Sequence, residues 1–209
     1  MSENEEQEPG RKMELLMGLL IAVFAAALAI NDLGAGRYGD DEKIAIDNHA
    51  QMYSWYQSKS IKQSLVKGQV ELLQTLEQAK AINTTYKSAI DSHVVKMKSK
   101  IAKYDKEMEE IQKGSAALGK DKWIQEDAEG KLGNIVGAEE WKRTYEILGQ
   151  AGDKYDMGTL FLQLCLVLGA IGLVIQEAST RRIFLFLMLG LGFIGVYFTV
   201  IAYNLSWSV

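Results

Sequence analysis

Three long apolar stretches are the feature that most restricts what this chain can fold into. They cover residues 15–30, 157–175 and 183–201, and the first two are separated by a highly charged region. A helix that crosses the hydrocarbon core of a bilayer needs about 20 mostly apolar residues. We therefore predict three transmembrane helices at 13–33, 156–177 and 182–204, an acidic tail at 1–12, a non-membrane domain at 34–155 and a C-terminal tail at 205–209.

The first apolar stretch has a second interpretation. Arg11 and Lys12 before it, and Ala27-Leu28-Ala29 near its end, also resemble a secretory signal with a small-residue cleavage site. The length of the stretch and the acidic tail before it favour a retained helix. With either interpretation, residues 34–155 lie on the same side of the membrane.

The orientation is predicted from basic residues in short loops, which stay in the cytoplasm. Arg181 and Arg182 lie in the short loop between the second and third apolar stretches, and Arg11 and Lys12 precede the first. We therefore expect an inner-membrane protein that crosses the bilayer several times. Its N-terminus would be inside, and residues 34–155 and the C-terminus would be outside. An inverted protein with a cytosolic domain remains the alternative, since only four basic residues decide the orientation.

The charged region is electrically balanced. Residues 34–155 contain 19 Lys or Arg and 19 Asp or Glu, so there is no basic surface to attract nucleic acid. His49 and His93 are the only histidines and Cys165 is the only cysteine. These residues show no metal-ligand spacing and no nucleophile motif, and we expect no catalytic residues, no cofactor, no metal and no enzyme activity.

The pattern of apolar residues predicts an all-α domain between the membrane helices. Gly34, Gly36 and Gly39 are expected to end the first membrane helix, and a second helix to run from about Asp41 to Lys113. A further helix is expected at 138–176, continuous with the second membrane helix. The predicted fold is thus a long helical hairpin, or coiled coil, between one N-terminal transmembrane helix and a C-terminal transmembrane pair.

Two sets of residues are candidates for self-association. The first is a heptad seam, in which apolar residues recur at steps of four and three so that helices can supercoil; a second helix of the same chain or another subunit could cover it. The second set consists of small residues in the third apolar stretch, which allow membrane helices to approach closely. The candidates are Ile90, Val94, Met97, Ile101, Tyr104, Met108 and Ile111 in the seam, and Gly190, Gly192 and Gly195 in the membrane.

The segment 48–63 has the most unusual composition. On a helix it would place aromatic, amide and lysine side chains on two neighbouring faces, which is typical of a surface that contacts a protein or lipid headgroups. Packing of the same side chains onto the hairpin partner is the alternative explanation. The residues proposed for partner contact are Asn48, Met52, Trp55, Tyr56, Lys59, Lys62 and Gln63.

The run Trp55-Tyr56-Gln57-Ser58-Lys59-Ser60-Ile61-Lys62 lies after one apolar helix and before a C-terminal pair. In this respect the chain resembles the bacterial membrane-protein family catalogued as domain of unknown function 4337. The resemblance implies a membrane location, this order of elements and a bacterial origin. It implies no active site, because the family has no established activity.

These observations favour a membrane scaffold or assembly protein that forms homo-oligomers. We expect its partners to be membrane lipids and another membrane protein. An oligomeric channel or membrane sensor subunit is the alternative, in which Gln163, Thr199 and the glycine faces would line a path for water. The apolar stretches contain few ionisable residues, which argues against active transport.

Overall fold

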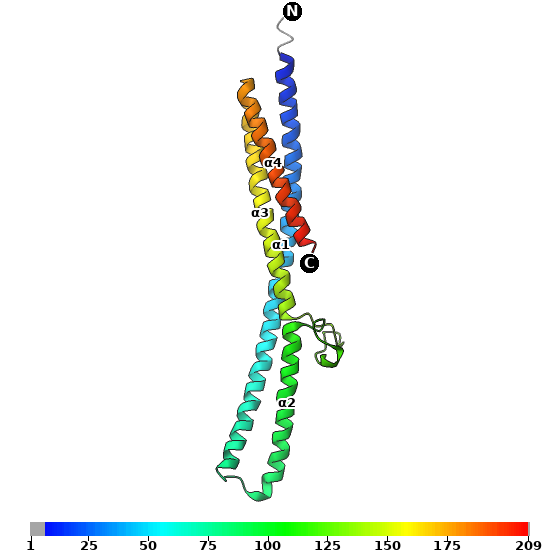
Figure 1. Cartoon of the computed structure of the whole chain (residues 1–209), viewed down its shortest axis with the longest axis vertical. Coiled ribbons are helices and arrows are strands. Elements are labelled where there is room, and N and C mark those ends of the chain that lie inside the picture. The colour runs from blue at the N-terminus through cyan, green and yellow to red at the C-terminus, as the bar shows by residue number, and fades with distance from the viewer. Residues whose placement is uncertain (1–6, 209) are drawn as a thin grey trace, which may run out of the picture. The chain divides into compact units, whose positions relative to one another are not determined.

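The computed structural model describes residues 7–208, with side chains from Arg11 onward, so residues 1–6 of the predicted acidic tail lie outside the described residues. The all-α prediction is confirmed: the described residues contain no strand and only an isolated bridge between Glu126 and Leu132. The elements are α1 (Gln7–Gln78), the 3₁₀ turn η1 (Thr84–Tyr86), α2 (Lys87–Lys113), the 3₁₀ turn η2 (Lys120–Lys122), α3 (Ala138–Val174) and α4 (Ala178–Ser206) (Figure 1).

The chain divides into two compact units. The first, here called the membrane unit, contains the chain up to Lys43 and from Thr144 onward. The second, the hairpin unit, is Ile44–Arg143. Both α1 and α3 contribute to each unit, because each helix continues past the residue at which the two units divide.

The membrane unit has an apolar core made by all three of its helices. Phe24 of α1, Leu162 and Cys165 of α3 and Met188 of α4 are buried together. Many other large apolar side chains of these helices are exposed, as expected where the surroundings are lipid rather than water. Three helices of the described chain are long and apolar enough to cross a membrane, consistent with an integral membrane protein.

Small residues bring these helices close together. A Cβ atom at Gly195 would lie 2.7 Å from Cγ of Leu162, and one at Gly192 would overlap the ring of Phe24. On α3, a Cβ atom at Gly172 would likewise overlap the Met17 side chain. Gly192 and Gly195 therefore pack within the chain, whereas Gly190 faces open space.

The predicted break at Gly34, Gly36 and Gly39 is wrong. Helix α1 continues through all three glycines, and none of them has positive φ. A glycine inside a helix costs only about 1 kcal/mol relative to alanine, which packing can offset. Gly34 shows such packing, because a Cβ atom there would lie 2.8 Å from Cε1 of Tyr155.

The predicted uninterrupted helix from Asp41 to Lys113 is also wrong. The chain reverses direction at residues 79–86, so that α2 lies alongside the C-terminal part of α1 (Figure 1). Lys80 adopts a left-handed conformation with φ 57°, and the Asn83 side chain accepts a hydrogen bond from the Thr85 amide at 3.0 Å. The hairpin is therefore made by α1 and α2 and closes earlier than expected, whereas the continuous helix predicted at 138–176 agrees with α3.

The heptad seam of α2 is covered within the chain. All seven seam residues are buried or half-buried, whereas His93 and Val95 beside them are exposed. Helix α1 supplies part of this cover, since the Gln63 amide donates to the Ile101 carbonyl oxygen at 3.3 Å. Of the two covers that the sequence allows, a helix of the same chain is therefore present.

Candidate interaction surface

A buried glutamate organises the loop between α2 and α3. Glu110 is fully buried, and its Oε1 accepts a hydrogen bond from the Ser115 hydroxyl at 2.7 Å. Its Oε2 accepts from the backbone amides of Ile124 and Gln125 at 2.7 and 2.8 Å. Backbone donors that are buried must be paired, so this one carboxylate fixes two distant parts of the loop to the end of α2.

Ser115 adds a second set of bonds. Its amide donates to the Ile135 carbonyl at 2.8 Å, and its hydroxyl accepts from the Ile135 amide at 3.1 Å. Its carbonyl accepts from the indole of Trp123 at 2.9 Å. Residues 114–137 have little regular secondary structure, yet these bonds hold them in a defined conformation against the hairpin.

Helix α1 borders this loop with one face of the segment 48–63, here called the aromatic segment. Asn48, Met52 and Trp55 line a shallow groove of about 410 Å³ together with loop residues and Trp141. The three residues lie at successive turns of α1 and therefore share one of its faces. The structure therefore brings them together, on a surface that includes a second tryptophan from α3.

Asp127 shapes the opposite wall of this groove. Its carboxylate accepts hydrogen bonds from the Asn134 side-chain amide and from the backbone amides of Lys131 and Glu129, at 2.8, 2.8 and 2.9 Å. These bonds stabilise the charged form, so the pKa of Asp127 lies below its ordinary value, chiefly because of the Asn134 amide. The loop wall is thus held by an ionised side chain at neutral pH.

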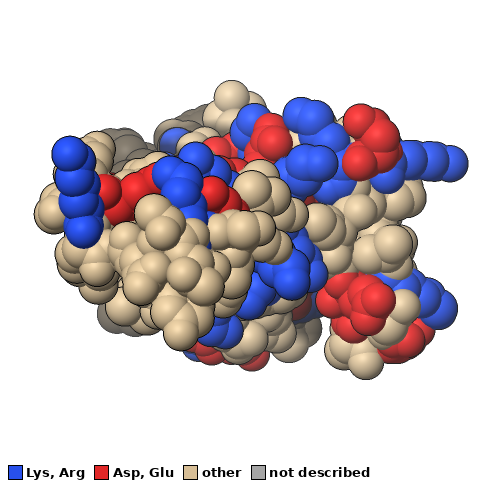
Figure 2. Space-filling model, turned by 90° about the horizontal axis from the view of Figure 1, so that it is seen from below, with Lys and Arg blue, Asp and Glu red and all other residues tan. Residues whose placement is uncertain are grey.

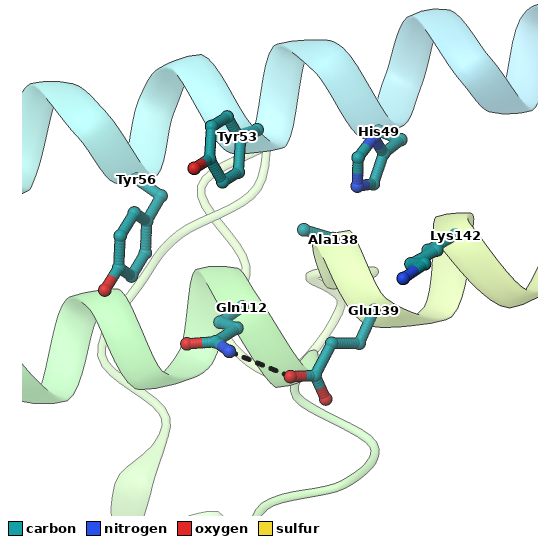
Figure 3. A pocket seen from close by; sticks show the side chains of 7 residues that line it. All are labelled: His49, Tyr53, Tyr56, Gln112, Ala138, Glu139 and Lys142. Carbon is teal, nitrogen blue, oxygen red and sulfur yellow. Dashed lines mark hydrogen bonds between the residues drawn. The ribbon is translucent and has the colours of Figure 1, made fainter.

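The neighbouring face of the aromatic segment lines a second pocket, of about 370 Å³. Figure 3 shows His49, Tyr53 and Tyr56 of α1 directed toward Gln112 of α2 and toward the start of α3. The three rings form a ladder, with 6.3 Å between the centroids of each adjacent pair and interplanar angles of 17° and 14°. The remaining lining residues are Gln112, Ala138, Glu139 and Lys142.

Polar groups form the other side of this pocket. The Gln112 side-chain amide donates to Glu139 Oε1 at 2.8 Å, which links α2 to α3 across the pocket (Figure 3). Tyr53 remains 53% exposed although it lines the pocket. The pocket thus combines an accessible aromatic wall with amide, carboxylate and ammonium groups, which suits an interface better than an enclosed small-molecule site.

Two of the predicted contact residues bind within the chain instead. The Lys59 ammonium lies 2.7 Å from Glu107 Oε2, with only 16% and 6% of the two side chains exposed. Gln63 donates to Asp105 at 2.5 Å and is itself buried. Lys59 and Gln63 therefore hold α1 against α2, whereas Lys62 is exposed.

No single sign of charge dominates the face shown in Figure 2, where Lys and Arg side chains are interspersed with Asp and Glu. This distribution agrees with the equal numbers of acidic and basic residues at 34–155. Among the described residues, no group of three or more His, Cys, Asp or Glu side chains is placed to hold a metal ion.

A polar node that the sequence analysis did not single out lies in the membrane unit. Asn31 is fully buried, and its amide donates to Thr159 Oγ1 at 2.7 Å and to the Tyr155 carbonyl at 3.1 Å. The Thr199 hydroxyl donates to Asn31 Oδ1 at 2.7 Å. One amide therefore links α1, α3 and α4, which is a recognised use of polar side chains in membrane helices.

Comparison with known protein families gives one match. The family model described as Domain of unknown function (DUF4337) matches residues 13–205, which include all three membrane-spanning candidates and the whole hairpin unit. The chain belongs to this family. No curated protein and no solved structure matches it.

The residues proposed to line a channel in this DUF4337 member lie in different environments. Thr199 is engaged by Asn31, and Gly192 and Gly195 are packed against neighbouring helices. Gln163 lies on the exposed surface of α3. Within a single chain these residues do not face a common path.

Proposed function

We propose that this DUF4337 protein is a non-enzymatic membrane scaffold that presents the aromatic segment of its hairpin unit to a partner. The observation that carries the proposal is the pocket formed by the ring ladder of His49, Tyr53 and Tyr56. Aromatic side chains with one accessible polar end are enriched in interfaces, because they bury a large area with little loss of side-chain entropy. The partner is a membrane protein or a lipid headgroup.

Self-association is a second part of the proposal. Ile61, Leu65, Leu72 and Leu76 lie on one side of α1, away from the buried Gln63 and Val70, and all four are 39–64% exposed. Their spacing is close to that of a coiled-coil seam. Such a repeating stripe fits a second copy of the same helix. The α2 seam is less available for self-association, because α1 already covers part of it.

Photocrosslinking in native membranes tests the partner surface. A benzophenone amino acid replacing Tyr53 should give one discrete adduct, whose mass spectrum identifies the partner. The matched control replaces Tyr86, which is 64% exposed in the turn of the same unit. Equal labelling from the two positions, or none from Tyr53, would contradict a specific surface at the pocket.

Disulfide crosslinking tests self-association. In a Cys165→Ser background, Leu65→Cys should form a covalent dimer in membranes under mild oxidation, because equivalent residues of a parallel pair meet at the seam. Glu71→Cys, an exposed position further along the same helix and off the stripe, is the control. A chain that stays monomeric in mild detergent and forms no Leu65→Cys dimer would remove this part of the proposal.

A further inference from the structure

A groove lies on the membrane unit near the start of α1. It has a volume of about 560 Å³ and is lined by Arg11, Glu14, Leu15, Gly18, Leu19 and Leu173. Leu15 and Leu19 are 68% and 63% exposed, so the walls are apolar and open to the surroundings. The charged residues of the lining, Arg11 and Glu14, belong to the first turns of α1, and apolar residues and Gly18 continue from there into the membrane-spanning stretch.

Two glycines explain why α1 contacts α3 at one residue and leaves the groove open at the next. Gly172 of α3 has no side chain, so Met17 of α1 packs directly against that helix. Gly18, the next residue of α1, has no atom within 4 Å of the place where a Cβ would be. The helices are thus in contact at Met17, and the space beside Gly18 is left open.

An ion pair fixes the charged end of this region. Arg181 of α4 is almost completely buried, its Nη1 lies 3.0 Å from Glu14 Oε1, and its Nε donates to the Ile175 carbonyl at 2.8 Å. The Glu14 carboxylate is therefore compensated by Arg181. Arg11 is the cationic residue that lines the groove.

Charged residues of both signs lie at this end of the membrane unit. The described residues near the start of α1 and the α3–α4 turn include four cations, Arg11, Lys12, Arg181 and Arg182, and three carboxylates, Glu8, Glu14 and Glu177. Glu3, Glu5 and Glu6 add further negative charge in the sequence outside the described residues. A membrane groove lined by a guanidinium group at one end and by apolar walls has the two chemical features of a phospholipid site. Guanidinium groups bind phosphate oxygens through paired hydrogen bonds, and basic pockets between membrane helices bind anionic headgroups.

We propose that this groove binds one anionic phospholipid, with its phosphate at Arg11 and an acyl chain along Leu15, Gly18, Leu19 and Leu173. Lipid is the occupant because the groove opens from a membrane-spanning helix, where the surrounding medium is lipid. This site belongs to the membrane unit and does not depend on the function proposed for the aromatic segment of the hairpin unit.

Native mass spectrometry of the full chain in mild detergent tests the proposal. Dioleoylphosphatidylglycerol is titrated against dioleoylphosphatidylcholine, which carries the same chains on a zwitterionic headgroup. The wild-type chain should bind the glycerol lipid more tightly. Arg11→Gln should lower that affinity on the order of fivefold, as expected for one cation near an anionic headgroup. Gly18→Leu should fill the groove and lower the affinity for both lipids.

Two matched variants separate the groove from general effects. Arg182→Gln removes an exposed cation at the same end that does not line the groove, and Gly36→Leu adds a side chain at another α1 glycine with open space around it. Both should bind as the wild-type chain does. Equal affinity for the two lipids, equal losses in Arg11→Gln and Arg182→Gln, or unchanged binding in Gly18→Leu would overturn the proposal. Arg11 is exposed, so its variant should fold normally and decide the matter even where Gly18→Leu does not fold.

Discussion

Single buried polar residues determine local structure in both units of this protein. Glu110 in the hairpin unit and Asn31 in the membrane unit are each completely buried and each make three side-chain hydrogen bonds. Leaving a buried donor or acceptor unpaired costs about 1–3 kcal/mol, more than a new hydrogen bond adds on average. Substitutions at these two positions should therefore have larger effects than substitutions at exposed polar residues nearby.

Glu110→Ala should loosen the loop between α2 and α3. The amides of Ile124 and Gln125 lose their acceptor, so their hydrogen exchange should become at least about tenfold faster, while exchange in α4 stays unchanged. Glu109→Ala is the matched control, because Glu109 pairs with Lys113 and Lys122 at the surface. Unchanged exchange at both amides would show that the buried carboxylate does not hold the loop.

The loop should also respond to acid through Asp127. Because the pKa of Asp127 is lower in the folded protein than in the unfolded chain, its contribution to stability is complete above the unfolded value. It is lost as the pH falls through the lower, folded value. The protection factor of the Lys131 amide, which corrects for the intrinsic pH dependence of exchange, should therefore fall in that acidic window, and Asp127→Asn should remove this fall. A carboxyl titration midpoint at or above the ordinary value would contradict this assignment.

At the scale of helices, the sequence predicts those features that depend on a repeat along one segment. The three apolar stretches, the continuous helix 138–174 and the covered face of α2 follow from such repeats. The turn at residues 79–86 contains neither glycine nor proline, and Lys80 carries its left-handed conformation without a local signal. At Gly34, Gly36 and Gly39 the sequence predicts a helix end that does not exist. The packing of Tyr155 against Gly34 involves a helix distant in sequence, so the local pattern gives no sign of it.

The candidate sites were predictable to different extents for the same reason. The aromatic segment stands out by composition, and the spacing of Asn48, Met52 and Trp55 is enough to place them on one face. Lys59 and Gln63 bind side chains of α2, and this could not be predicted without knowing where the chain turns back. The Asn31 node joins residues 128 and 168 positions apart, and an asparagine near the end of an apolar stretch gives only a weak signal by itself.

Asn31→Leu should weaken the three-helix bundle. Hydrogen bonds between membrane helices contribute about 0.6–1.7 kcal/mol, so the variant should unfold at a measurably lower temperature in detergent, with helix content unchanged at low temperature. Asn204→Leu, at an exposed position of α4, is the matched control. Gly158→Ala should act in the same direction as Asn31→Leu, because its Cβ would lie 2.6 Å from Asn31 Oδ1. Equal melting temperatures for Asn31→Leu and Asn204→Leu would show that the node adds no stability.

For the whole molecule, the central claim is that three helices cross the bilayer and hold the α1–α2 hairpin outside the lipid. An odd number of crossings puts the two chain ends on opposite sides. It would also put the hairpin on the same side as the C-terminus, and from the basic residues near the α3–α4 turn we propose that this side is the extracytoplasmic one.

Labelling of single cysteines with a membrane-impermeant maleimide tests this claim most directly. Ser2→Cys, Lys100→Cys and Ser208→Cys are made one at a time in a Cys165→Ser background and labelled in intact cells and after permeabilisation. We expect positions 100 and 208 to react in intact cells and position 2 to react only after permeabilisation. Reaction of positions 2 and 208 from the same side, or recovery of the folded chain in the soluble fraction without detergent, would contradict the three-helix membrane unit.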